Sequence, residues 1–138
     1  MKLAKALSSA TINVSLSAGN FGAATGNCPI ITGDSNRVEY DYTVVTTNTS
    51  LLIASLSGKG FSNYGSAWSS VVGAIYVDGQ FCAWDRGLLQ PGDGATRVMG
   101  AAACTKTLFT GTHTISLCPT WVGIMSELEF FGNISILN

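Results

Sequence analysis

The chain reverses direction within residues 74–84, which read AIYVDGQFCAW. Asp78-Gly79 is the sequence signature of a two-residue type I′ hairpin, because both central residues of that turn need positive φ and Asp and Gly tolerate it. Mostly apolar residues flank the turn on both sides. We therefore expect two antiparallel strands here, over residues 70–77 and 80–86.

Further strands are predicted on either side of this hairpin. The clearest is RVEYDYTVV at 37–45, in which both tyrosines share one face with Val38 and Val44 while the charged residues share the other. The remaining predicted strands lie at 9–17, 51–57, 97–104, 112–118 and 128–137. Glycine-rich stretches, including 18–36 and 58–68, predict loops. About eight strands with no amphipathic helix predict an all-β antiparallel sandwich or jelly roll.

The composition is poor in charge for a chain of 138 residues, a length typical of one domain. Charged residues make up 11% of the sequence, against about 25% in ordinary soluble proteins, and hydrophobic residues make up 46%. A small monomer needs charged residues to keep its exterior hydrated. We therefore expect copies of the chain, or a larger assembly, to cover part of its surface.

Two classes of partner are disfavoured by charge and hydropathy. The formal net charge of -1 provides no basic stripe to neutralise phosphates, so nucleic-acid binding is not expected. The longest apolar runs, such as VVGAIYV at 71–77, are far shorter than the roughly 18 residues that a membrane-spanning helix needs. No membrane insertion is expected either.

Three short motifs in the second half of the chain carry a resemblance to a known family. GAIYVDGQ at 73–80, LFTGTHTISL at 108–117 and FFGNISIL at 130–137 resemble, in this order, the last strands of the globular heads of the complement and tumour-necrosis-factor-like family. They look most similar to the heads of bacteriophage fibres and bacterial surface proteins. The resemblance implies a jelly-roll β-sandwich of about ten strands over residues 37–138, assembled as a homotrimer. Residues 1–36 would add a strand and an extended loop, within the same domain or as an assembly arm.

The resemblance also implies a function. Such a head is a non-enzymatic protein of a virion surface or the extracellular space, acting as a fibre head or capsid decoration in attachment or particle stabilisation. Its expected partners are its own copies and other virion proteins or a host-surface glycan or protein. A lectin-like carbohydrate-binding module is the alternative, and a glycosidase is a weaker one.

The hairpin is expected to serve assembly. Alternation places Tyr76 and Ile75 on opposite faces before the turn, and Phe81 opposes a tryptophan after it, so both faces are apolar. One sheet face of a two-layer sandwich meets water, so a second covering surface is required. We expect Ile75, Tyr76 and Phe81 to lie at an interface with a neighbouring subunit.

Ligand binding, if present, is expected on loops. Aromatic rings stack on the C–H faces of sugars, and amide or charged groups take the hydroxyls. Two segments offer that mixture, and the candidate residues are Phe61, Asn63, Tyr64 and Trp68 in the first, and Trp84, Asp85 and Arg86 in the second. The competing interpretation is that these rings fold under the sandwich as additional core.

The four cysteines allow one specific pairing hypothesis. Cys82 and Cys104 are equidistant from a reversal at Asp93, so they would stand opposite each other if their strands pair antiparallel, at a spacing that suits a disulfide. Cys28 and Cys118 would then form the second bridge. Four buried free thiols, in a particle assembled in a reducing cytoplasm, are the alternative.

No motif predicts catalysis, a metal site or a cofactor. His113 shares a strand face with apolar residues, which favours a hydrogen-bonded core or interface histidine over a general base. Carboxylates two apart, at Glu39 and Asp41 and at Glu127 and Glu129, would permit glycoside hydrolysis but are common on solvated strands. The cysteines lack C-x-x-C spacing, and no loop gathers the aspartates that calcium requires.

Overall fold

A computed structural model describes residues 6–16, 36–62, 69–89, 96–122 and 127–137 of the chain. These residues form β-strands and their connections, without a helix. The strands are β1 (Ala6–Leu16), β2 (Asn36–Arg37), β3 (Tyr40–Thr46), β4 (Ser50–Ser62), β5 (Ser69–Val77), β6 (Gln80–Leu89), β7 (Thr96–Leu108), β8 (Gly111–Val122) and β9 (Glu127–Leu137). The all-β class predicted from the sequence is confirmed.

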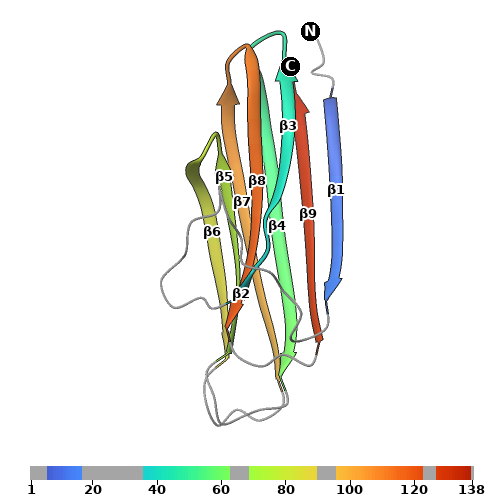
Figure 1. Cartoon of the computed structure of the whole chain (residues 1–138), viewed down its shortest axis with the longest axis vertical. Helices are drawn as coiled ribbons and strands as arrows, with labels where there is room; N and C mark the ends of the chain where they lie inside the picture. The colour runs from blue at the N-terminus through green and yellow to red at the C-terminus, as the bar shows by residue number, and fades with distance from the viewer. Residues whose placement is uncertain (1–5, 17–35, 63–68, 90–95, 123–126, 138) are drawn as a thin grey trace, which may run out of the picture.

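The strands form two antiparallel sheets (Figure 1). Sheet A has the order β1-β9-β4-β7. In sheet B, β8 pairs with β5, which pairs with β6, while β2 and β3 follow one another along the other edge of β8. The strand within residues 1–36 is thus an integral part of sheet A, hydrogen-bonded to β9 over most of its length.

Most connections pass from one sheet to the other. Along the chain, β1, β4, β7 and β9 belong to sheet A, and the strands between them belong to sheet B. Two successive pairs stay within sheet B: β2 with β3, which follow one another along β8, and β5 with β6, which form a hairpin. Three connections gather at one end of the sandwich: the β3–β4 loop at 47–49, the Asp78-Gly79 turn and the β7–β8 turn at 109–110 (Figure 1). We call this the turn end.

The core lies between the sheets and is built by alternation. Even-numbered residues of β4 and β9 point inward from sheet A, and odd-numbered residues of β5 and β8 point inward from sheet B. Trp121 and Phe130 meet across the gap, with ring centroids 6.1 Å apart. The buried cluster comprises Leu52, Ala54, Leu56, Val71, Ile75, Val77, Ala102, Cys104, Leu108, Ile115, Leu117, Trp121, Leu128, Phe130, Ile134 and Ile136. The sandwich expected from the sequence follows from this burial of one face of each sheet.

The hairpin forms where the sequence predicts it, but its returning arm contains a bulge. Asp78 and Gly79 have φ of 51° and 75°, as a type I′ turn requires. The register then shifts between Ile75 and Tyr76, and Cys82 is the extra residue on β6. A bulge changes which side chains share a face. Phe81 and Trp84, predicted on opposite faces, are therefore both exposed, at 56% and 50%.

Two of the three hairpin residues predicted at a subunit interface are already buried within the single chain. Ile75 is fully buried in the core of its own chain, because its parity on β5 points it between the sheets. Tyr76 is also buried, on the outer side of sheet B, in a small cluster with Ala74 and Cys118. Neither side chain needs a second subunit to cover it. Phe81 is exposed, and its ring meets the edge of Tyr76 at 5.9 Å.

The first part of the predicted loop at 58–68 is strand instead, because β4 continues to Ser62. Gly58 is a packing residue: a Cβ built on it would lie 2.5 Å from Cγ1 of Val71 and 2.6 Å from Cε1 of Phe130. Gly100 on β7 is similarly close to backbone atoms of Gly87 and Val71. These glycines let the two sheets approach closely, and the sequence pattern of a glycine-rich turn was misleading here.

A disulfide joins Cys82 of β6 to Cys104 of β7, with a Cα–Cα distance of 5.7 Å. The pairing is the one expected from the sequence, but the geometric reason for it is wrong. β6 and β7 do not form a ladder; they are edge strands of different sheets, and the disulfide crosses between them. Cys118 is also disulfide-bonded, whereas its expected partner, Cys28, lies outside the described residues.

Replacing Gly58 by alanine should destabilise the fold. The added methyl group overlaps two buried side chains, and overpacking of this kind costs about 1–3 kcal/mol. Urea unfolding of G58A beside S57A, a neighbour on the other face of the strand, measures the difference. Equal unfolding midpoints for the two variants would contradict this prediction, because they would mean that the sheets move apart to accept the methyl group at little cost in free energy.

Removing the β6–β7 disulfide should lower stability without changing the fold. The bridge closes a loop with a sequence separation of 22, for which the chain-entropy model gives about 3 kcal/mol. The double variant C82A/C104A leaves the bond at Cys118 in place, so its urea midpoint isolates this bridge. An unchanged midpoint would mean that β6 and β7 are held together by their other contacts.

Candidate functional site

The outer face of sheet A carries few charges among the side chains that the structure describes. Its described side chains on β4, β7 and β9 are small, hydroxylic or apolar: Leu51, Ile53, Ser55, Ser57, Ala101, Ala103, Thr105, Thr107, Phe131, Asn133, Ser135 and Leu137. The ion pair on these three strands joins Lys59 Nζ to Glu129 Oε2 at 3.1 Å, so the two charges largely neutralise each other. Leu51, Ile53 and Phe131 are exposed. We call this surface the sheet A face.

A shallow groove of about 350 Å³ lies at one side of the sheet A face. Gly58 and Gly100 line it together with Ser57 and Ala101, their neighbours on β4 and β7. The ring of Phe131 forms one wall, with Lys59 Nζ 5.7 Å from its centroid. Asp85, from the other sheet, stands at the opposite rim.

Asp85 has a structural contact as well as a place in the groove. Its Oδ2 accepts a hydrogen bond of 2.9 Å from the backbone N–H of Ala101 on β7. This contact supplements the disulfide in holding the edge strands of the two sheets together. A carboxylate fixed in this way keeps a defined orientation toward the groove.

The other ligand residues predicted from the sequence are only partly assembled. Trp84 and Arg86 flank Asp85 on β6 and are exposed, and Arg86 makes an interaction within the chain. Phe61 belongs to β4 rather than to a loop, opposite Arg97. Asn63, Tyr64 and Trp68 lie outside the described residues.

Sequence reasoning missed Phe131 and Lys59, the two residues that face each other in the groove. Phe131 is one of two adjacent phenylalanines, and strict alternation requires one of them to point outward. Lys59 shares the outward parity of Ser57 on β4, but it fell in the segment predicted as a loop. The alternation signal was therefore available only for Phe131.

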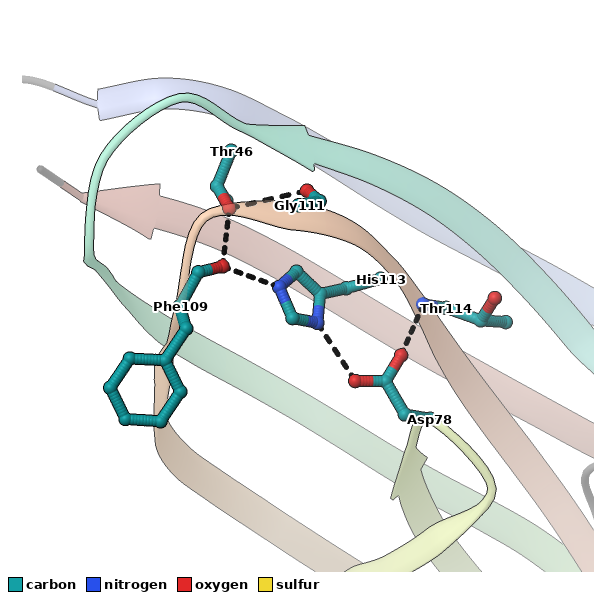
Figure 2. A network of polar contacts seen from close by, with 6 residues as sticks. All are labelled: Thr46, Asp78, Phe109, Gly111, His113 and Thr114. Carbon is teal, nitrogen blue, oxygen red and sulfur yellow. Dashed lines mark hydrogen bonds and ion pairs between the residues drawn. The ribbon is translucent and has the colours of Figure 1, made fainter.

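A polar network closes the turn end of the sandwich (Figure 2). The Nδ1 atom of His113 lies 2.8 Å from Asp78 Oδ2, and its Nε2 atom lies 2.7 Å from the carbonyl oxygen of Phe109. The Thr114 N–H donates to Asp78 Oδ1 at 2.8 Å. This arrangement confirms the interpretation of His113 as a hydrogen-bonded histidine.

The same network extends to the end of β3. The hydroxyl of Thr46 lies 2.8 Å from the Phe109 carbonyl oxygen and 3.3 Å from that of Gly111, and donates to them (Figure 2). The Phe109 oxygen thus accepts from both a threonine and a histidine. Its ring points away from the network and is 72% exposed.

Metal-binding and catalytic groupings are sparse in the described part of the chain. Those residues contain no group of three or more histidine, cysteine, aspartate or glutamate side chains that could hold a metal ion. Of the carboxylates noted in the sequence, Glu129 is paired with Lys59, and Asp41 lies on the outer face of β3. Among the described residues, no helix is long and apolar enough to cross a membrane.

Comparison with known proteins gives little guidance. No protein-family model and no curated protein matches the chain. Among solved structures, one similar chain is the GH26-CBM35 β-(1,4)-mannanase of Podospora anserina, with 14% identity over 92% of this chain and a TM-score of 0.34. The match spans 25% of that enzyme's length. A likeness this weak carries no argument about function.

Proposed function

We propose that this chain is a self-assembling head domain of a virion surface, a fibre head or capsid decoration protein, with a jelly-roll fold. The strand order supports the jelly roll. If β2 and β3 are counted as one interrupted strand, eight strands remain, and their connections cross between the sheets except at one hairpin. That number of strands, joined through two Greek keys, is what defines a jelly roll.

The observation that carries the proposal is the sheet A face. Monomeric proteins rarely leave a large weakly polar surface open to water, and such surfaces mark interaction sites. Among the side chains that the structure describes on this face, the charges of Lys59 and Glu129 neutralise each other beside exposed Leu51, Ile53 and Phe131. A second copy of the chain is the partner that fits this surface best. It would bring the same paired charges to the interface, so association would bury no unpaired charge.

A homotrimer is the assembly that the resemblance implies. Its interface would differ from the one first expected: Ile75 and Tyr76 are already buried, so the sheet A face replaces the first arm of the hairpin. Such a head would act in attachment to a host glycan or protein, or in stabilising a particle through other virion proteins. It would need no cofactor and perform no catalysis.

An aspartate at position 53 should prevent self-assembly. Burying an unpaired carboxylate costs about 3 kcal/mol or more, which weakens association roughly a hundredfold. Sedimentation velocity of I53D should show a monomer where the unmodified chain is a trimer. The control is T43D, which places the same charge at an exposed position on the outer face of sheet B. A monomeric unmodified chain, or an I53D trimer, would contradict the proposal.

Carbohydrate binding is the second candidate function, and the groove favours it. The ring of Phe131 offers a stacking surface beside the carboxylate of Asp85 and the ammonium group of Lys59. Including Glu129, the groove carries two negative charges and one positive charge, which suits a neutral saccharide better than an acidic one. Its volume lies at the lower end of the range of about 300–1,000 Å³ for ligand sites. The two functions conflict, because assembly through this face would cover the ring.

Replacing Phe131 by alanine tests the second candidate. On an array of neutral and acidic host-surface glycans, the unmodified chain should retain neutral glycans, and F131A should lose them because the stacking surface is gone. The control is F109A, which removes an exposed ring at the turn end. Retention of glycans by F131A, or their absence with the unmodified chain, would exclude the groove as a sugar site.

A further inference from the structure

The two nitrogen atoms of His113 both face hydrogen-bond acceptors. A backbone carbonyl can only accept, so the Nε2 atom must carry a hydrogen to bond the oxygen of Phe109. An ionised carboxylate also only accepts, so the Nδ1 atom must carry one to bond Asp78. A neutral imidazole has a single N–H, and either tautomer would leave one nitrogen lone pair opposed to an oxygen. The geometry therefore selects the doubly protonated, positively charged ring.

The two acceptors belong to different connections of the fold. Asp78 is the first residue of the β5–β6 turn, and Phe109 begins the β7–β8 turn. His113 lies on β8 opposite Val44 of β3, and its side chain is 14% exposed. The β5–β8 ladder and the bond of 2.8 Å from the Asp78 N–H to the Thr114 oxygen already hold the β5–β6 turn against β8. The imidazolium extends this contact to the carbonyl of Phe109 in the β7–β8 turn. The bond from Thr46 to the same carbonyl brings in the end of β3.

We propose that His113 is a pH-dependent latch, which closes the turn end of the sandwich in its protonated form and releases the Phe109 turn when the ring loses a proton. The inference is independent of the proposed function, because it concerns the fold of a single chain. Its visible consequence is at Phe109, whose exposed ring is carried by the latched turn. The position of this ring becomes dependent on pH.

The electrostatics of the neighbouring groups agree with the geometry. Hydrogen bonds to Asp78 and to the Phe109 carbonyl raise the pKa of His113, together with the charge of Asp78, against opposition from burial and from Lys106. Burial by itself would raise the pKa of Asp78, but hydrogen bonds from His113 and Thr114, with the charges of His113 and Lys106, outweigh it and lower that pKa. Among the described residues, Lys106 on β7 is the other charged group that acts on the imidazole. The residues that the neighbouring strands place nearest are apolar: Val44 of β3 lies opposite His113, and Val77 of β5 lies opposite Ile115.

The signs of these shifts define the pH range of the closed latch. A histidine whose folded pKa is raised stabilises the fold fully below its ordinary value of 6.5 and loses that contribution as pH rises through the folded pKa. An aspartate whose folded pKa is lowered contributes above its ordinary value of 3.8 and loses it as pH falls through the folded pKa. Both contributions are present between these two ordinary values, and the latch opens on the alkaline side.

The test uses the single histidine of the chain, which gives one imidazole signal in a proton NMR titration. In the unmodified chain His113 should titrate above 6.5. In D78N the midpoint should fall, because the carboxylate is removed while the turn is kept: asparagine accepts positive φ as readily as aspartate, and its oxygen can still accept from Thr114. D41N, which removes a carboxylate from the outer face of β3, should leave the midpoint unchanged.

Hydrogen exchange then tests whether titration moves the turn. Protection factors of the amides at 109–111, corrected for intrinsic exchange, should drop between pH 5.5 and pH 8.5 in the unmodified chain and in D41N. In H113Q they should be low at both values, because no imidazolium joins the two turns, and in D78N the drop should occur at a lower pH, in step with the lowered midpoint. Three results would each overturn the latch: a titration midpoint of His113 at or below 6.5, the same midpoint in D78N as in the unmodified chain, or protection factors at 109–111 that do not change with pH.

Discussion

The structure depends on close contact between two sheets, and this contact is possible because side chains are absent at particular points. Gly58 and Gly100 stand where a methyl group would overlap the opposite sheet. With these positions empty, the inward leucine, isoleucine and phenylalanine side chains of the two sheets form one buried cluster. The disulfide and the bond from Asp85 to Ala101 close the same edge. The sheet A face and the turn end both depend on this contact between the sheets.

Closing the sandwich leaves two contrasting surfaces. The sheet A face, as far as its side chains are described, carries one ion pair beside exposed apolar residues, and a surface of that kind suits another protein surface or a stacked sugar ring. The turn end is instead polar on its inside, where one histidine bridges two connections, and it presents an exposed aromatic ring outward. Assembly and loop conformation are therefore assigned to different parts of the fold, and a change in one need not disturb the other.

Alternation along the chain predicted most of the fold because burial of one sheet face imposes a period of two. It succeeded for β3, where the tyrosines pack on the core and Asp41 points outward. It failed along β6, because the bulge at Cys82 adds one residue and reverses the parity beyond it. It also failed at Gly58, because a glycine that admits a neighbouring side chain looks, in a sequence, like a glycine that permits a turn.

The sequence by itself determined the strand content and the hairpin at Asp78-Gly79, because these follow from periodicity and local φ preferences. Tertiary structure alone decided that the disulfide joins two sheets, that Ile75 faces the core and that Phe131 borders a groove beside Asp85. It also brought His113 between Asp78 and Phe109. The physical reason is that such contacts depend on which strands become neighbours, and the order of strands in space is set by the packing of the whole chain.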